Sequence, residues 1–123
     1  MKNEKDFEKI EMPILSSLLQ IYENIHTLIL TFPKHERYSL GEKIQDALLV
    51  SVELSILANN SSKYEKEKIL LRLNCKIELS KILIRVCLHC KIIEFNTYLE
   101  LQNKLQEIGK MTQGWVKYTK NSL

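Results

Sequence analysis

The sequence contains little of what tight turns, disulfide bonds and membrane spans require. Its 123 residues include only three Gly and two Pro, too few for the many turns of an all-β fold. Three Cys is an odd count that does not support a disulfide framework. No apolar run approaches the roughly 20 residues of a membrane-spanning helix, and Met1–Asp6 has no apolar signal-peptide core. We therefore expect a cytoplasmic protein without a membrane partner.

Arrangements of side chains that are typical of catalysis are also missing. The chain has no His-Glu-x-x-His motif, no nucleophile elbow and no paired carboxylates in an apolar setting. Cys87 and Cys90 invite a zinc or thiol interpretation, but a structural zinc site wants four ligands, and only Cys75, His26 and His35 remain to complete it. The alternative is that Cys87 and Cys90 pack as small apolar residues. We therefore predict no enzyme, no cofactor and no metal.

What the sequence does have is helical periodicity. Apolar residues recur every three to four positions in four segments, which predicts helices over about 13–31, 36–59, 63–91 and 97–119. Strand-like alternation is absent over any useful length. Four helices with short connections favour an all-α fold, an antiparallel up-down-up-down four-helix bundle over residues 13–120 that follows a charged N-terminal tail at 1–12.

Three Ser or Thr residues stand three positions before a Glu, which is the spacing of a capping box at a helix start. The pairs are Ser39 with Glu42, Ser62 with Glu65, and Thr97 with Glu100. They predict helix starts near 40, 63 and 97. The second helix has an alternative start at 34, directly after Pro33.

The segment 63–91 has apolar residues on two opposite sides. At about 100° per residue, one stripe consists of Leu70, Leu73, Ile77, Ile84 and Leu88. The second stripe, roughly opposite, consists of Cys75, Leu79, Ile82, Val86 and Cys90. A helix on the surface of a small bundle needs only one stripe. The second stripe therefore predicts another partner, either a buried position within the domain or a neighbouring subunit.

Basic residues fill the seams between these stripes. Residues 63–94 carry eight Lys or Arg against four Glu, with Arg72 and Lys76 on one seam and Lys81 and Arg85 on the other. Such side chains neutralise phosphates without reading base sequence. The alternative is a solvated seam in which Lys81 pairs with Glu78. In a homo-oligomer each basic residue is repeated around a symmetry axis, which produces a strong positive ring.

The last helix carries two glycines and the single Trp. Gly109 and Gly114 lie inside a helical pattern, where each costs about 1 kcal/mol relative to Ala. This cost suggests close approach of another backbone, within the bundle or across subunits. Trp115 either anchors the end of the helix by packing or offers a stacking surface for a nucleobase.

Three polar residues, Arg37, Tyr38 and Lys43, follow the turn between the first two predicted helices. They are placed to contact a partner protein or an RNA. Alternatively, they belong to the turn itself, with Arg37 paired to a neighbouring Glu at position 36 or 42. Both interpretations stay open at the level of sequence.

Two passages go beyond a generic bundle. They are Phe32–Ile44, FPKHERYSLGEKI, and Leu105–Lys117, LQEIGKMTQGWVK. With the Leu- and Arg-rich third helix between them, they resemble the Avd family, the accessory variability determinants of diversity-generating retroelements, over about residues 13–117. The first passage is also similar to a wider group of four-helix proteins encoded in 23S ribosomal RNA intervening sequences. The Gly-Trp ending points to Avd.

The resemblance implies a non-catalytic four-helix protein that assembles into a barrel-shaped homopentamer with a basic surface. Such proteins bind the reverse transcriptase of the retroelement and its template RNA or cDNA, and they support error-prone cDNA synthesis. Lys81 and Arg85 match positions that are commonly Arg in the family, and Lys110 and Lys117 match basic positions of the Gly-Trp motif. The alternatives are a protein associated with ribosomal RNA intervening sequences and an interaction module without a nucleic-acid role.

The predicted sites therefore fall into three groups, of which the partner or turn motif consists of Arg37, Tyr38 and Lys43. The nucleic-acid group consists of Arg72, Lys76, Lys81, Arg85, Lys110 and Lys117. The group for oligomer contact or packing consists of Cys75, Leu79, Ile82, Val86, Cys90, Gly109, Gly114 and Trp115.

Overall fold

A computed structural model of the chain describes residues 12–121, so the predicted tail at 1–12 lies, apart from Met12, outside the described residues. Every element in the described part is helical: α2 (Met12–Ile29), α3 (Lys34–Glu36), a π-helical stretch at Arg37–Gly41, α4 (Glu42–Asn59), α5 (Lys63–His89) and α6 (Phe95–Asn121). Because α3, the π-helical stretch and α4 follow one another without a break, residues 34–59 form one helical segment. The fold is therefore built from four helical segments, as the periodicity predicted.

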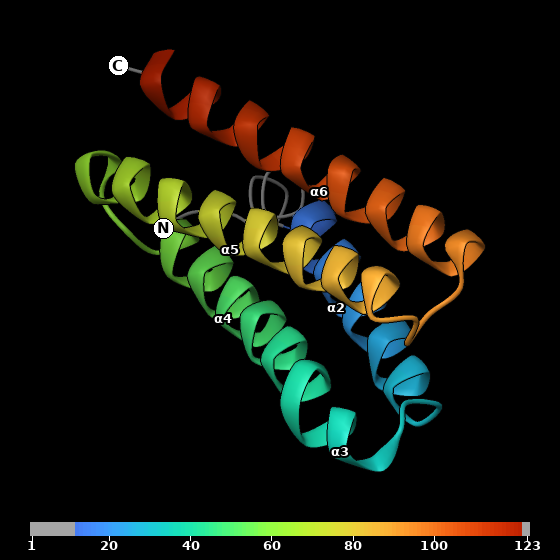
Figure 1. Cartoon of the computed structure of the whole chain (residues 1–123). Helices are drawn as coiled ribbons and strands as arrows, with labels where there is room; N and C mark the ends of the chain where they lie inside the picture. The colour runs from blue at the N-terminus through green and yellow to red at the C-terminus, as the bar shows by residue number, and fades with distance from the viewer. Residues whose placement is uncertain (1–11, 122–123) are drawn as a thin grey trace.

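The four segments alternate in direction along the chain and pack into a bundle (Figure 1). α5 packs against both α4 and α6, and α2 contacts the same two helices. Each helix therefore lies beside its neighbours in the chain, and the contact between α6 and α2 closes the bundle. This arrangement agrees with the up-down-up-down topology expected from short connections.

One apolar core fills the centre of the bundle. The four long helices each contribute Leu or Ile side chains that are almost fully inaccessible, and each such side chain stabilises the fold by roughly 1.5–3 kcal/mol on burial. They include Leu18 and Ile21 of α2, Ile44 and Leu48 of α4, Leu73 and Ile77 of α5, and Leu105 and Ile108 of α6.

α5 buries only one of its two apolar stripes. Leu70, Leu73, Ile77 and Ile84 of the first stripe are buried, and Leu88 packs against the core. In the second stripe Leu79 is 38% exposed and Ile82 is 46% exposed. Cys75 and Cys90 are also exposed, and Val86 is half-buried. The expectation that a buried position within the domain covers the second stripe is therefore wrong for the single chain, and a neighbouring subunit stays a prediction.

One of the three predicted capping boxes has its cap. The Ser62 hydroxyl accepts a hydrogen bond from the backbone N–H of Glu65 at 3.4 Å, and α5 begins at the next residue. The other two predictions are wrong. Ser39 lies inside the π-helical stretch, because the helix already begins after Pro33, whose carbonyl accepts N–H groups from Glu36 and Arg37. Thr97 lies inside α6, because α6 begins at Phe95.

α5 ends earlier than expected, at His89, in a Schellman motif. The Cys87 carbonyl accepts the Ile92 N–H at 2.8 Å, and the Leu88 carbonyl accepts the Lys91 N–H at 3.0 Å. Lys91 has a φ of 60°, in the left-handed region that favours glycine. This sharp reversal allows α6 to begin within a few residues and to pack antiparallel to α5.

A close approach of α2 explains the glycine in the π-helical stretch. A Cβ on Gly41 would lie 3.0 Å from Cγ2 of Ile29 and 3.3 Å from the carbonyl oxygen of Glu36. The sequence motif contains this glycine, but only the packing of α2 gives it a physical reason.

Candidate nucleic-acid interface

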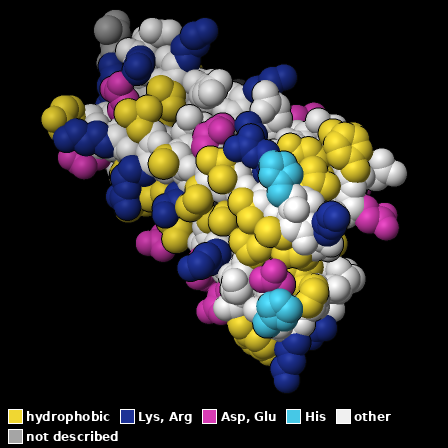
Figure 2. Space-filling view, viewed as in Figure 1, with side chains coloured by type: hydrophobic (Ala, Val, Ile, Leu, Met, Phe, Trp, Pro, Cys, Tyr) yellow, Lys and Arg dark blue, Asp and Glu magenta, His cyan; other side chains and the backbone are white. Residues whose placement is uncertain are grey.

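The six basic residues predicted to contact nucleic acid lie on two sides of α5. Lys81 and Arg85 are one turn apart on the side that faces α6, and α6 itself carries Lys110 and Lys117. Lys76 lies on the opposite side, where it lines a groove against α4, and Arg72 precedes it by one turn. Figure 2 looks onto the face formed by α4, α5 and α6 and shows apolar side chains exposed between Lys and Arg side chains.

Lys81 links α5 to α6. Its Nζ donates to Oε1 of Gln106 at 2.8 Å and lies 3.3 Å from Oε1 of Glu78. The side-chain amide of Gln102 donates to the Lys81 carbonyl at 2.8 Å. The Lys81 side chain is only 24% exposed. The predicted pairing with Glu78 is therefore present, and Lys81 has a structural role across the seam.

The Lys81–Gln106 hydrogen bond shows which residues of α5 and α6 lie opposite each other, and so gives the order of the basic residues along the seam between these helices. Because the two helices are antiparallel, Arg85 lies one turn beyond this bond in one direction, and Lys110 and Lys117 lie beyond it in the other. At 1.5 Å per residue, the positions from Arg85 to Lys117 cover about 22 Å. We call Arg85, Lys81, Lys110 and Lys117 the α5–α6 basic track.

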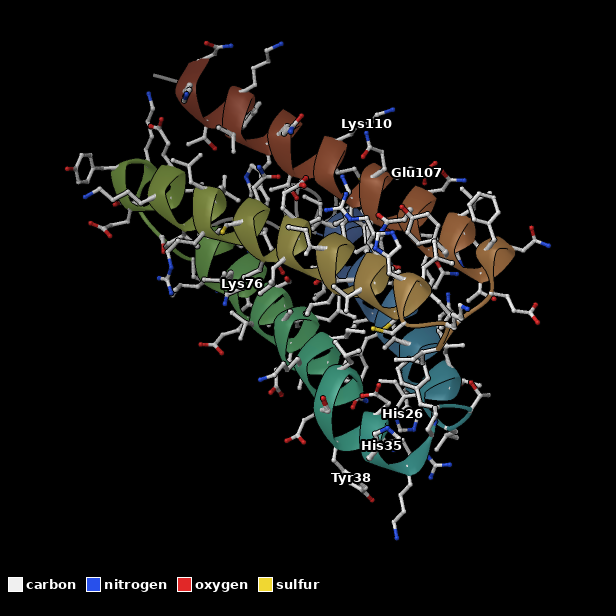
Figure 3. All side chains as sticks on the ribbon, in the orientation of Figure 1. His26, His35, Tyr38, Lys76, Glu107 and Lys110 are labelled. Atoms are coloured by element: carbon white, nitrogen blue, oxygen red, sulfur yellow. The ribbon has the colours of Figure 1, made fainter. Side chains whose placement is uncertain are left out.

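Three members of this track are available to a ligand. Arg85, Lys110 and Lys117 are exposed, and none of them forms an ion pair within residues 12–121. Figure 3 shows Lys110 projecting from α6, with Glu107 one turn before it. The exposed amide of Gln113 lies between Lys110 and Lys117 on the same helix. Lysine, arginine and amide side chains are those that bind phosphate oxygens.

The second basic location is a groove of about 260 Å³ between α4 and α5. Lys43 and Asp46 of α4 and Lys76 of α5 provide its charged groups, and its apolar lining comes from Ala47, Val50, Leu79 and Leu83. The structure thus brings Lys43 and Lys76 to one groove although they are distant in the sequence. Val50 and Leu83 pack against the core without being fully buried, and neither was among the predicted site residues.

Arg37 binds backbone carbonyls just after α2. Its Nε donates to the Phe32 carbonyl at 3.1 Å, and its Nη2 donates to the Leu30 carbonyl at 2.9 Å. Both carbonyls belong to the turn that follows α2, so the guanidinium holds this turn against the start of the next helical segment. The predicted pairing of Arg37 with the Glu at 36 or 42 is therefore wrong, because the guanidinium is used in the turn. Tyr38, in contrast, is 71% exposed.

The two glycines of α6 have no close backbone neighbour in the bundle, whereas the Trp of the same helix is buried. A Cβ on Gly109 would meet Cγ2 of Ile77 at 3.9 Å, an ordinary contact, and a Cβ on Gly114 would meet nothing within 4 Å. The expectation of a close backbone within the bundle is therefore wrong for both, and approach across subunits stays a prediction. Trp115 is 3% exposed, so it packs in the core and has no free ring face for a nucleobase.

The cysteines separate into one buried and two exposed thiols. Cys87 is buried, while Cys75 and Cys90 are exposed. Burial raises the pKa of Cys87 from 9.0 to about 11, and Cys90 and Glu36 add to the shift. A raised thiol pKa disfavours the reactive thiolate. Within residues 12–121, no three His, Cys, Asp or Glu side chains come close enough to hold a metal ion.

Comparisons with known proteins give one match. A family model described as bAvd-like matches residues 12–119. No curated protein and no solved structure gives a significant match. None of the helices in residues 12–121 is long and apolar enough to span a bilayer.

Proposed function

Since the chain is a member of the bAvd-like family, we propose that it is a non-catalytic accessory protein of a diversity-generating retroelement. In this role it binds the reverse transcriptase and the template RNA or its cDNA, and it supports mutagenic reverse transcription in the cytoplasm. Membership of the family supports the accessory role. The α5–α6 basic track supports the nucleic-acid part and is the observation that carries it.

The track suits contact with a phosphate backbone rather than recognition of bases. Its cations follow one line along two packed helices, so a strand lying on the seam meets several positive charges in succession. Release of counterions from the phosphates then provides affinity that does not depend on sequence. The three unpaired cations of one track provide only weak binding, and repetition of the track in an oligomer strengthens it.

The exposed second stripe of α5 supports the oligomeric part of the proposal. Leu79 and Ile82 lie on it with Cys75 exposed beside them, and exposed apolar rows of this kind mark interaction surfaces. In the proposed assembly, a homopentamer, this stripe is covered by a neighbouring copy. The basic tracks of all copies then surround one symmetry axis.

A salt series on RNA binding tests the nucleic-acid part. Fluorescence anisotropy with labelled single-stranded template RNA should give a linear fall of log affinity with log salt, with a slope of about −0.7 per phosphate contacted. Arg85→Glu, Lys110→Glu and Lys117→Glu should each weaken binding and make the slope shallower, for every RNA sequence tried. Lys34→Glu is the matched control, because Lys34 is exposed on α3 at the end of the bundle. If a variant that carries all three substitutions binds RNA as tightly as the parent chain, the basic track is not the binding surface.

A further inference from the structure

We infer that the outward face of α4 in one copy packs against the outward face of α5 in the next copy. This inference rests on the oligomer of the proposed function and names the two surfaces that form its contact. It makes the contact heterologous, with different patches meeting, rather than a patch that pairs with itself. The two faces are complementary in charge, and both expose apolar side chains.

The outward face of α4 is acidic and apolar. Leu49, Ile56 and Leu57 are each between 45% and 49% exposed. Three acidic residues, Glu42, Asp46 and Glu53, are exposed on the same side of the helix. They are separated from one another by four and seven residues, and each has an exposed apolar residue three, four or seven positions away, so all of them share one helix face. Within the described residues none of the three carboxylates forms an ion pair. Lys43, at the edge toward α5, is the one cation of α4.

The outward face of α5 is apolar and basic. Its centre is the second stripe, in which Leu79 and Ile82 are exposed, and Leu71 adds a third large apolar side chain that is 55% exposed. Arg72 and Lys76 border this stripe on the side of α4, and neither forms an ion pair within residues 12–121. The α5 face is therefore complementary to the α4 face. Each exposes a row of apolar residues, and the unpaired cations of α5 are opposite in charge to the unpaired carboxylates of α4.

The charges also oppose the simplest alternative, in which like faces meet. Over its whole length α4 has three acidic residues and one basic residue, whereas α5 has seven basic and three acidic residues. Two α4 faces would place carboxylates against carboxylates, and two α5 faces would place cations against cations. Like charges brought together at an interface oppose association. Of the three pairings that these two faces allow, the pairing of α4 with α5 is the one that joins opposite charges while covering both apolar rows.

The position of the two helices in the bundle allows such contacts to close. α4 and α5 are adjacent in the bundle, and adjacent helices of a four-helix bundle face outward in directions roughly 90° apart. A head-to-tail contact between two faces at this angle closes into a ring of about four or five copies. The contact also assigns Arg72 and Lys76 to the subunit interface, which leaves the α5–α6 basic track as the exposed surface for nucleic acid.

Charge reversal on each face, read by light scattering, tests this pairing. Glu42→Lys with Glu53→Lys changes the α4 face, and Arg72→Glu with Lys76→Glu changes the α5 face. Asp46 is left unchanged because it shares a groove with Lys76 in one chain. Each double variant should shift from the mass of the assembly to that of one chain, 14.5 kDa. All four changes in one chain should restore the assembly, because opposite charges again meet. Circular dichroism checks that every variant keeps the helical content of the parent.

Mixing the two double variants gives the sharpest outcome. Each retains one intact face. In an equimolar mixture the intact α5 face of one variant meets the intact α4 face of the other, and the two reversed faces also bring opposite charges together. The mixture should therefore form assemblies in which the two kinds of chain alternate. A mixture that stays monomeric, or double variants that keep the parental mass, would overturn the pairing of α4 with α5. A monomeric parent chain would instead refute the oligomer of the proposed function, and the inference with it. Glu53→Lys and Arg72→Glu as single changes at exposed positions give the same test if a double variant does not fold.

Discussion

Replacing each of the three glycines by Ala tests how closely the surrounding groups pack, because the structure gives each glycine a different environment. Gly41 has helical backbone angles, φ −58° and ψ −47°, and Gly109 and Gly114 lie within α6. Replacement of a helical Gly by Ala stabilises the helix by about 1 kcal/mol when nothing opposes the added methyl group. The same gain is therefore available at all three positions, and differences in the measured result report the surroundings of the Cβ.

Gly114→Ala should raise the free energy of unfolding by about 1 kcal/mol, since its Cβ meets nothing within 4 Å. Gly109→Ala should give a similar gain, because its nearest contact, Ile77, lies at ordinary van der Waals distance. At Gly41 the Cβ would lie 3.0 Å from the buried Ile29. Forcing such overpacking costs about 1–3 kcal/mol, which cancels or exceeds the helical gain. Gly41→Ala should therefore fall about 1–3 kcal/mol below Gly114→Ala.

Urea unfolding followed by circular dichroism, at one fixed protein concentration, measures these differences. Light scattering on the same samples separates an effect on the fold from an effect on assembly. A Gly41→Ala chain as stable as Gly114→Ala would refute the close approach of α2 to the π-helical stretch. A Gly114→Ala chain that keeps its fold and loses assembled mass would place another subunit at that glycine.

Three further predictions address single contacts. Arg37→Ala should lower the free energy of unfolding by about 1–3 kcal/mol, because two charge-assisted hydrogen bonds to carbonyls of the turn after α2 are lost. Urea unfolding should show no comparable loss for the exposed neighbour Tyr38→Ala. Lys91→Gly should raise the same free energy by about 0.5–1 kcal/mol by relieving the positive φ, and an equal gain for Lys91→Ala would contradict this cause. Cys87 should alkylate far more slowly than Cys75 and Cys90 at pH 8, as measured by mass spectrometry. Because its pKa is raised to about 11 in the folded state, the stability linked to this thiol should be complete below pH 9 and decline as the pH rises through 11. Cys87→Ala should lack that decline.

The architecture was predictable because helical periodicity is a local property. Apolar residues every three to four positions identified the helices and the inward stripe of α5, and the Ser62–Glu65 pair identified the start of α5. Predictions of individual local contacts were wrong in the turn between α2 and α4, where several nearby groups compete for the same partners. Ser39 does not begin a helix, because Pro33 begins it earlier. Arg37 does not pair with a nearby Glu, because carbonyls of the turn after α2 lie beside it.

The sequence by itself determined four helices, one buried stripe and a second apolar stripe on α5, since burial of one helix side requires only a repeating pattern along the chain. Tertiary structure alone decided which side chains from different helices meet. It joined Lys81 to Gln106, and it placed Lys43 and Lys76 on one groove. It also exposed an acidic, apolar face on α4 beside a basic, apolar face on α5. These relations depend on how the helices lie against one another, and that arrangement follows from packing of the whole core rather than from any single segment.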